Sequence, residues 1–409
     1  MTEIFKKAVA ELNLDRSDWQ LVKFGDVAIQ QKQTIDRENT ELTRYVKGEH
    51  MYSEDLHLRE WGELKDEYLG PAFIRKFEEG DVLYGSRRTY LRKVVVAPFE
   101  GITSNTTFVI KANEDKIDKR LLPFIMLSEG FTQHSIENSK GSVNPYVNWK
   151  DLAGYEFLLP PIEKQADIVK LLCMADEVLQ KDLKLKVATE NHFQKNRNEI
   201  FSVDSYHPKS VFRNKLCKEK RVDRCMSEKM LNGIYKSKEF HGRGVRLINM
   251  GELFAYPIIR DEEMSLLDLT EKEKTQFLVE AGDLIFARRS LVIEGAGRCS
   301  FVEEHTSPMS FESSMIRVRF NAKSVNSKYV YHFLRSIEGR KRIRRIVGFT
   351  TVAGITGSDL AKVKIPTVGK DEEDKIAQYL DSFDDVILNC SMKINTTKKM
   401  QKSLINQVF

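Results

Sequence analysis

Clustered arginines, rather than a catalytic constellation, are the residues of this chain whose types and spacing suit recognition chemistry. They stand in pairs at Arg87-Arg88 and Arg288-Arg289, and in the run from Arg340 to Arg345. A guanidinium group presents fixed donors that match phosphate oxygens and the acceptor edge of guanine. For any single cluster the alternative is a solvated face with ordinary ion pairs. As sets, the clusters indicate contact with nucleic acid.

The signatures of the common catalytic and metal-binding classes are missing from the sequence. It has no Gly-x-x-x-x-Gly-Lys-Ser/Thr loop, no His-Glu-x-x-His helix and no Gly-x-Ser-x-Gly elbow. The five cysteines are scattered, so neither a disulfide framework nor a zinc site is indicated. Asn144-Pro145-Tyr146 resembles part of an amino-methyltransferase motif, but Val147 follows it, and a DNA-facing turn is the better interpretation. We therefore expect no catalytic residues and no bound metal.

The composition is that of a globular protein with more than one core. Hydrophobic residues make up 41% of the chain, and 65 basic against 60 acidic residues leave a net charge of +5. No segment approaches the roughly 18 consecutive apolar residues of a membrane span. The first residues lack the apolar core of a secretory signal. We expect a cytoplasmic protein without membrane contact.

An internal repeat covers nearly the whole chain. Residues 77–88 read FEEGDVLYGSRR and residues 278–290 read LVEAGDLIFARRS, each with Gly-Asp, two apolar residues and an arginine pair ending at Arg88 or Arg289. The last residues of the copies, 198–201 and 406–409, match at an offset of 208 positions (409 − 201 = 208). So many matches in one order indicate a duplication. Alternating apolar residues and β-branched content predict an α+β unit in each copy.

Each copy is predicted to end in a long helix, from about Glu163 to Phe201 and from about Asp371 to Phe409. Some 38 residues would span roughly 55 Å. Apolar residues recur at 4-3 spacing with charged flanks, which is typical of a coiled-coil seam. The seam positions are Ile168, Leu172, Ala175, Leu179, Leu183 and Val187 in the first helix, and Ile376, Leu380, Phe383, Ile387, Ile394, Leu404 and Val408 in the second.

The two helices are expected to pair with each other in antiparallel orientation. Their equal lengths, matched ends and lack of internal glycine favour this pairing over two helices that each pack only on their own domain. The globular domains would then lie at opposite ends of a pseudo-twofold dumbbell. The predicted boundaries are a first domain at 1–160, a helix at 161–201, a second domain at 202–368 and a C-terminal helix at 369–409.

At this level of detail the sequence resembles the specificity subunits of type I restriction–modification systems. The most specific segment is Pro160-Pro161-x-Glu163-x-Gln165-x-x-Ile168, at the start of the first long helix. The opening Trp19-x-x-Val22-x-Phe24-Gly25-Asp26-Val27 is similar to the family's start of a target-recognition domain. LNGIYKS at 231–237, followed by GVRLINMGEL at 244–253, is similar to a common version of the second half.

The second copy departs from the family pattern in two places. It has no Trp-x-x-Val-x-Leu-Gly-Asp opening, since residues 205–225 are of another kind. Its long helix begins with Glu372-Glu373-Asp374-Lys375 instead of the Pro-Pro-x-Glu-x-Gln pattern. Whether the second helix start makes the same contacts as the first is therefore open.

The resemblance implies a subunit that does no chemistry itself. Each domain would read one half of a bipartite double-stranded DNA target, and the helices would set the number of unread bases between the halves. Two methyltransferase subunits would dock on the helical region and use S-adenosylmethionine. Restriction subunits, which carry the motor and nuclease with ATP and magnesium, would complete the complex. Because residues 30–72 differ most from residues 209–275, the two half-sites should differ.

The candidate DNA-contacting residues are basic and polar side chains near the Gly-Asp strands and the glycine loops. In copy one they are Arg87, Arg88, Tyr90, Arg92, Lys140, Ser142, Asn144 and Asn148. In copy two they are Arg288, Arg289, Ser290, Arg298, Thr350 and Thr351, with Arg342, Arg344 and Arg345 suited to phosphates.

Three alternatives are consistent with the sequence. A combined restriction–methylation enzyme of type IIB kind would use the same subunit with other partners. A coiled-coil scaffold would bind protein only. A nuclease could use scattered acidic residues and lysines, although no paired carboxylates at a convincing spacing support it.

Overall fold

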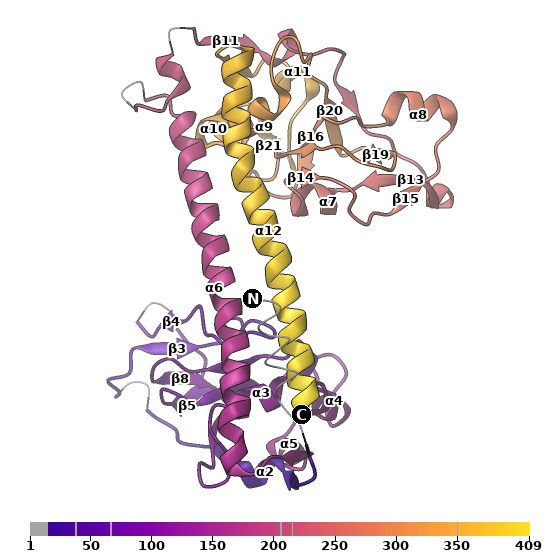
Figure 1. Ribbon diagram of the computed structural model, residues 1–409. Helices are drawn as coiled ribbons and strands as arrows, with labels where there is room; N and C mark the ends of the chain where they lie inside the picture. Colours follow the sequence, from indigo (N-terminus) through magenta and orange to yellow (C-terminus); the bar gives the residue numbers. More distant parts are fainter. Residues whose placement is uncertain (1–14, 37–38, 66–67, 205–206, 215, 350) are drawn as a thin grey trace. The chain divides into compact units, whose positions relative to one another are not determined.

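The computed structural model describes residues 15–36, 39–65, 68–204, 207–214, 216–349 and 351–409 (Figure 1). The chain divides into two compact units. Unit 1 combines Met1–Leu183 with Met392–Phe409, and unit 2 is Lys184–Ser391. Each unit thus contains one globular domain and a segment of each long helix. None of the described helices is both long enough and apolar enough to cross a membrane.

The globular part of unit 1 contains two four-stranded sheets. One has the order β2-β9-β6-β7 and the other β4-β3-β8-β5. The strands are β2 (Ala28–Gln31), β3 (Arg44–Val46), β4 (Gly62–Glu63), β5 (Phe73–Phe77), β6 (Val82–Gly85), β7 (Val94–Val96), β8 (Gly101–Ser104) and β9 (Thr107–Ala112). A separate antiparallel pair joins β1 (Gln20–Lys23) to β10 (Glu156–Leu159). The helices are α2 (Phe24–Val27), α3 (Leu122–Leu127), α4 (Glu129–Glu137) and α5 (Trp149–Ala153).

Unit 2 repeats this plan with a larger main sheet, ordered β12-β20-β16-β18-β14. Its strands are β12 (Leu231–Asn232), β14 (Ile258–Ile259), β16 (Leu284–Ala287), β18 (Cys299–Val302) and β20 (Met315–Val318). A second sheet joins β15 (Leu266–Leu267), β13 (His241–Ile248) and β19 (Met309–Phe311). A third joins β17 (Arg289–Ser290), β22 (Ala353–Gly354) and β21 (Gly348–Phe349). The helices are α7 (Met250–Ala255), α8 (Glu271–Phe277), α9 (Ser327–Arg335), α10 (Ile337–Arg344) and α11 (Gly357–Leu360).

The predicted mixed α/β fold with an internal repeat is confirmed. In both units the strand after Gly-Asp lies at the centre of three antiparallel strands, β9-β6-β7 in one and β20-β16-β18 in the other. Ser128 caps α4 and Ser336 caps α10, each by accepting a hydrogen bond from a backbone N–H three residues on. These serines are 208 positions apart (336 − 128 = 208).

The second copy also has an opening strand, although its sequence lacks the Trp-x-x-Val-x-Leu-Gly-Asp motif. β11 (Lys218–Arg221) pairs with β23 (Lys364–Thr367), with Lys218 opposite Thr367, just as Gln20 lies opposite Leu159 in unit 1. Residues 218–221 thus take the place of the opening strand, although their sequence is of another kind. Every residue of β11 is exposed, so backbone pairing alone defines the strand and leaves no side-chain pattern to find.

The long helices are α6 (Ile162–Ile200) and α12 (Lys370–Val408), within a residue or two of the predicted ranges. In unit 1, the last turns of α12 join the core of the first domain, where Leu404, Ile405 and Val408 pack in one cluster with Ile168 and Leu172. In unit 2, Phe201 after the end of α6 is fully buried against Tyr329 and Phe333. Each globular core is thus completed by the end of the helix that follows the other repeat.

Candidate nucleic-acid interface

The two Gly-Asp turns are built alike and start the central strands β6 and β16. Gly80 and Gly282 have φ values of +87° and +92°, which strongly favour glycine. Asp81 accepts a hydrogen bond from the backbone N–H of Glu78, and Asp283 from that of Glu280, each at 2.8 Å. Both aspartates are buried.

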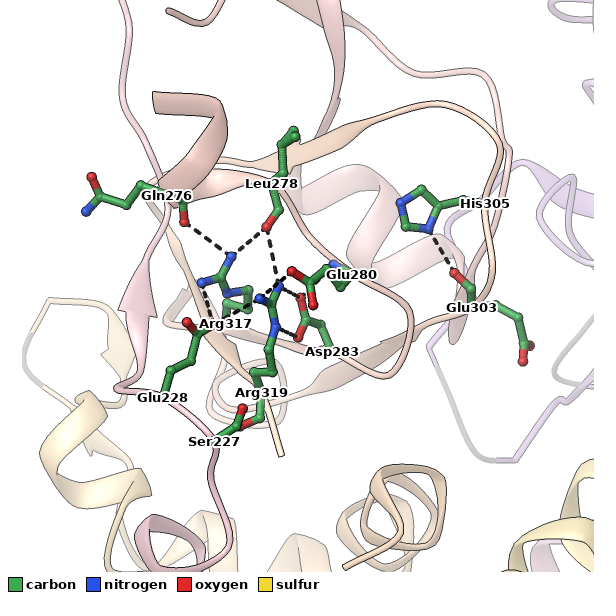
Figure 2. Close-up of polar contacts among 10 residues, drawn as sticks. All are labelled: Ser227, Glu228, Gln276, Leu278, Glu280, Asp283, Glu303, His305, Arg317 and Arg319. Carbon is green, nitrogen blue, oxygen red and sulfur yellow. Dashed lines mark hydrogen bonds and ion pairs between the residues drawn. The ribbon is translucent and has the colours of Figure 1, made fainter. Parts of the chain in front are cut away.

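A cation on the neighbouring strand, or directly after it, lies beside each of these buried carboxylates. In unit 2, Arg319 donates to both carboxylate oxygens of Asp283, at 2.8 and 2.7 Å, and Arg317 donates to the Leu278 carbonyl at 2.6 Å (Figure 2). The hydrogen bond to Asp283 raises the pKa of Arg319. In unit 1, Lys111 occupies the position of Arg319 (319 − 111 = 208), with its Nζ 3.8 Å from Asp81. The Gly-Asp motif is therefore a structural device that fixes where the following arginines emerge.

The segment of unit 1 that carries Arg87 and Arg88 pairs with the glycine loop, which is the segment from Lys140 to Asp151. Arg87 lies opposite Tyr146, and Tyr146 in turn pairs with Lys140. Arg88 adopts a left-handed conformation with φ +50°, and its N–H donates to the Pro145 carbonyl at 2.7 Å. Two segments more than fifty positions apart are thus joined by β-bridges, and we call them ribbon 1 (residues 86–88 and 140–147).

Unit 2 has the same arrangement, formed by β17, β22 and β21, which we call ribbon 2 (residues 288–290, 348–349 and 351–355). Arg289 lies opposite Gly354 and Ser290 opposite Ala353. Gly354 pairs with Gly348. Gly354, Ala353 and Gly348 stand 208 positions after Tyr146, Pro145 and Lys140 of ribbon 1, respectively (354 − 146 = 208).

The pairing corrects the sequence alignment of the arginine pairs by one residue. Aligned by their ends, Arg88 would match Arg289. In the structure the counterpart of Arg289 is Arg87, since each lies opposite the equivalent residue of the glycine loop. Arg288 matches Ser86, because each carbonyl accepts at 2.9 Å from the N–H of the equivalent residue, Val147 or Ile355. A run of two arginines cannot reveal its own β register, which the partner strand defines.

Most of the predicted residues of unit 1 lie together on and beside ribbon 1. Arg87, Arg88 and Tyr90 are exposed, and the Arg87 guanidinium lies 6.0 Å from the centroid of the Tyr146 ring. The remaining exposed polar residues of the set are Lys140, Ser142, Asn144 and Asn148. Lys140 and Asn148 both bond the Asp151 carboxylate, at 3.3 and 3.2 Å, and the Lys140 contact lowers the pKa of Asp151. Ser142 and Asn144, at the turn, are thus better placed to face a ligand.

In unit 2 the predicted residues divide between ribbon 2 and its surroundings. Arg289, Arg344, Arg345 and Thr351 are exposed, and no ion pair is recorded for these arginines among the described residues. Thr350 lies outside the described residues. Arg288 and Ser290 are partly buried, and Ser290 accepts from the N–H of Val292 at 3.2 Å.

Three of the predicted arginines already have partners within the fold. Arg92, 11% exposed, pairs with Glu54 at 3.1 Å and Glu129 at 2.5 Å. Arg342, 13% exposed, bonds Glu338 at 2.8 Å and also pairs with Glu219. Arg298 is partly buried over the Phe254 ring, and burial lowers its pKa. We assign Arg92 and Arg342 a structural role, in place of the phosphate or base contacts predicted for them.

The predicted seam of α6 is largely buried within unit 1, but not between helices alone. Ile168, Leu172 and Leu179 are 5% exposed or less, and Leu183 is partly buried. Ile168 and Leu172 pack against the first domain as well as against α12. At the polar edge of the seam, Gln401 donates to Asp176 at 3.2 Å.

In unit 2 the contacts run antiparallel. Phe193 stacks on Phe383 with ring centroids 5.6 Å apart, and Tyr379, one turn earlier on α12, donates to Asn196, almost one turn later on α6. Leu380 is fully buried, and Ile376, Phe383 and Ile387 pack at the edge of the same cluster. Val187 is 54% exposed, so its place in the seam is wrong. Both interpretations of the helices therefore hold in part: they pair with each other and also pack on the domains.

Two kinds of important residue escaped the sequence interpretation. Arg340 was counted with the basic run, but it donates to the carbonyls of Gly297 and Glu294, at 3.0 and 2.9 Å, and so holds the loop after β17. Asn198 and Asn406 belong to the matched ends of the copies, yet nothing in their type indicated a contact. Asn406 accepts from the N–H of Glu129 at 2.7 Å, and Asn198 from that of Ile337 at 2.9 Å. The common 208-residue offset was the signal that could have found them.

One group among the described residues has the composition of a metal site. His332, Asp381 and Asp384 place ligand atoms within 4.8 Å of one another in unit 2. The His332 ring already bonds Asp381 at 2.8 Å. Burial is the main cause that lowers the pKa of His332 and raises the pKa of Asp384, and the charges of Arg197 and Lys328 lie close enough to act on both groups. These two cations compensate the carboxylates and disfavour a divalent ion, so we interpret the group as a buried polar network.

Comparison with known proteins gives consistent matches over the chain. A profile of the type I restriction modification DNA specificity domain matches residues 16–188 and 248–397. The chain is 21% identical over 413 residues to the MjaVIII specificity subunit of Methanocaldococcus jannaschii, covering 95% of this chain and 91% of that protein. It is 26% identical over 163 residues to the EcoDI specificity subunit of Escherichia coli, covering 38% of this chain and 34% of that protein.

Solved structures with the same fold are also found. The type I restriction–modification S subunit from M. genitalium is 13% identical, covers 98% of both chains and superposes with a TM-score of 0.58. A chain from a structure describing complex assembly and conformational transition of the type I R-M system is 17% identical, with a TM-score of 0.56 and coverage of 96% of this chain and 97% of that one. At these identities the likeness concerns the fold alone.

Proposed function

Because this chain belongs to the type I restriction–modification DNA specificity family, we propose that it reads a bipartite DNA target for such a system, one half with each unit. The observation that carries this proposal is the presence of two ribbons of equal backbone design with different exposed side chains. The major groove of B-DNA is wide enough for a small β-ribbon. Equal scaffolds with unequal side chains are what reading two different half-sites requires.

In unit 1 the readers would be Arg87, Ser142 and Asn144. Arginine pairs best with guanine, and asparagine with adenine. Arg88 and Lys140 would contact phosphates and fix the position of ribbon 1 on the duplex. In unit 2, Arg289 and Thr351 would read bases, and Arg344 and Arg345 would contact phosphates. The resulting target is asymmetric.

The long helices would set the spacer and dock the partner subunits. Both helices keep large apolar side chains exposed, which include Met174, Leu185, Val187, Val386, Leu388 and Met392. Such side chains on otherwise charged helices are suited to binding protein. We propose that two methyltransferase subunits with S-adenosylmethionine dock there, and that restriction subunits bring ATP, magnesium and the nuclease. This chain would bind and position, and would catalyse nothing. The same subunit in a type IIB-like enzyme would differ only in these partners.

Methylome sequencing tests the proposal in cells that express the chain together with its methyltransferase. We expect adenine methylation at one bipartite, asymmetric motif, lost when the chain is absent. Arg87→Ala should relax the preference at one base of one half-site, and Arg289→Ala at one base of the other, each by about 1–3 kcal/mol of discrimination. Lys272→Ala, which removes an exposed charge on α8 away from ribbon 2, is the matched control.

Two outcomes would reject this function. A methylome that stays the same without the chain, while the methyltransferase is expressed and active, would favour the protein-binding scaffold. Metal-dependent cleavage of DNA by the isolated chain would favour the nuclease.

A further inference from the structure

The outer end of ribbon 2 carries apolar side chains that nothing in unit 2 covers. Leu291 is 87% exposed, Val292 57%, Phe349 59% and Val352 36%. Ser290 pairs with Ala353, and Ala353 pairs with Phe349, so the residues just beyond these pairs lie at one end of the ribbon. A single exposed leucine is ordinary on a protein surface, but four neighbouring apolar side chains at the tip of a ribbon are not.

The segment that carries Leu291 is braced. Arg340 donates to the carbonyls of Gly297 and Glu294, at 3.0 and 2.9 Å. Gly295 lies so close to Ser290 that an added Cβ would be 2.1 Å from its hydroxyl oxygen. Leu291 is therefore presented on a turn held from both sides, and ordering it on binding would cost little conformational entropy.

The charges of ribbon 2 and of the segment before it fit a polyanion better than an apolar protein surface. Arg289 lies two residues before Leu291, and Arg344 and Arg345 lie four and three residues before the start of β21. All three are exposed, and no ion pair is recorded for them in the described part of the chain. A ribbon with an apolar tip at one end and guanidinium groups toward the other matches a stack of bases flanked by phosphates.

Ribbon 1 does not have these groups at the equivalent positions. By backbone pairing the counterpart of Leu291 is Thr89, which is 3% exposed, and the counterpart of Phe349 is Gly141 (349 − 141 = 208). Ribbon 1 instead exposes Val143 at its turn, a shorter side chain that reaches less far from the backbone. The difference is thus specific to unit 2.

We propose that Leu291, supported by Phe349, is a wedge that enters one base step of the half-site read by unit 2 and unstacks it. This inference rests on the proposed DNA-reading function. Leucine and phenylalanine are among the side chains that open base steps and kink the duplex. Because pyrimidine–purine steps deform most easily, unit 2 would prefer such a step at a position where no polar side chain contacts the bases. The half-site of unit 1 would be read without a wedge.

The test uses the full chain in complex with its methyltransferase and a duplex of the motif found by methylome sequencing. 2-Aminopurine is placed in turn at each step of both half-sites, and fluorescence and affinity are measured. Apart from the adenines that the methyltransferase turns out of the stack, we expect a fluorescence rise at one step of the unit 2 half-site only. Leu291→Ala should abolish the rise and weaken binding roughly tenfold. A mismatch at that step should tighten DNA binding by the wild type. It should also reduce the difference in DNA affinity between wild type and Leu291→Ala, since an unpaired step is already easy to open.

Val143→Ala in ribbon 1 is the matched control and should leave the fluorescence rise at that step unchanged. Leu291 is exposed, so the variant should melt at the wild-type temperature, and this is checked first. Equal fluorescence and affinity for wild type and Leu291→Ala would overturn the wedge while the DNA-reading function stands. Loss of methyltransferase binding by Leu291→Ala would also overturn it, because the tip would then be a protein contact. If the wild-type complex shows no preference for the motif, both proposals fall.

Discussion

Asn406 accepts a hydrogen bond at 2.7 Å from the backbone N–H of Glu129, the first residue of α4. The equivalent bond in unit 2 joins Asn198 to Ile337, the first residue of α10, at 2.9 Å. The helix that follows one repeat thus provides a partner for a helix start in the domain of the other. The end of each long helix therefore packs on the globular domain of the other repeat.

Asn406→Ala should destabilise unit 1 by about 0.5–1 kcal/mol, the usual effect of removing a partner from a helix start where water can replace it. All three tryptophans, Trp19, Trp61 and Trp149, belong to unit 1. Urea unfolding followed by tryptophan fluorescence should therefore respond more to Asn406→Ala than to Asn198→Ala. Asn395→Ala, at an exposed position of α12 within unit 1, is the control. An equal decrease in the urea midpoint for Asn406→Ala and Asn198→Ala would show that tryptophan fluorescence does not follow unit 1 separately from unit 2.

Gln165 and Glu373 perform the same task with different chemistry. Gln165 accepts from the N–H of Asp118 at 2.7 Å, and Glu373 from that of Asn326 at 2.9 Å. Gln165 also donates to the Pro160 carbonyl, whereas Glu373 accepts from the Val368 N–H. Proline has no N–H to offer, so the first site needs a donor and the second an acceptor. The second helix start therefore makes the same first contact as the first.

Gln165→Glu should destabilise unit 1 by about 2–3 kcal/mol at pH 8, because a buried carboxylate would face the carbonyl oxygen of Pro160. The loss should shrink at pH 5, where a protonated carboxyl group can donate as the amide does. Urea midpoints at the two pH values measure this, with exposed Asp167→Asn as the control. A variant as stable as wild type at pH 8 would contradict the assigned contact.

Arg92→Ala should lower stability by about 1–3 kcal/mol, the usual range for charge-assisted hydrogen bonds in partly buried positions. Arg87→Ala should leave stability within about 0.5 kcal/mol of wild type and weaken DNA binding instead. The two arginines are five positions apart and make a matched pair, so the same preparations can be compared by urea unfolding and by DNA affinity. If Arg92→Ala folds normally and loses DNA binding, the original prediction for Arg92 is restored.

Asp384 should make the stability of unit 2 depend on pH. Burial, and after it the neighbouring Asp381, raises the pKa of Asp384 to about 6. A folded-state pKa above the ordinary value of 3.8 means that ionisation disfavours the folded state. This contribution is favourable at low pH and is lost as pH rises from about 4 through 6.

Asp384→Asn mimics the protonated carboxyl group at every pH. It should therefore gain about 1–3 kcal/mol relative to wild type between pH 4 and pH 7, with little further change above. Circular dichroism during thermal unfolding at several pH values follows this difference. The exposed neighbour Asp385→Asn serves as the control. A difference that stays constant from pH 4 to pH 8 would contradict the burial of an ionised group here.

The sequence predicted those elements whose residues carry their own pattern. The long helices follow from 4-3 spacing, and the repeat follows from fixed offsets. β11 could not be found, because an exposed strand of Lys218–Arg221 is defined only by its partner β23. The one-residue error in aligning the arginine pairs has the same cause. Side-chain identity suggests a strand, but the backbone register decides which residue lies opposite which.

The sequence indicated the regions of the candidate site, but it did not indicate which residues in those regions are exposed. Arg87 and Arg92 are alike in sequence, and only distant contacts distinguish them. Glu54 stands 38 positions before Arg92 in the chain, so its ion pair is invisible to any local pattern. The wedge residues were not singled out either, since an apolar Leu291 looks like part of a core until its exposure is known. Function at this interface depends on which side chains the fold leaves uncovered.

The exchange of helix ends also determines the order in which the chain can mature during translation. Every residue of unit 2 lies before position 392, so it can close as soon as that stretch has left the ribosome. Unit 1, although synthesised first, awaits Leu404, Ile405 and Val408, and its contact between Glu129 and Asn406 spans 277 positions. The nascent first domain therefore keeps an apolar face open until residues 404–408 have been made, and a chaperone would meet this face.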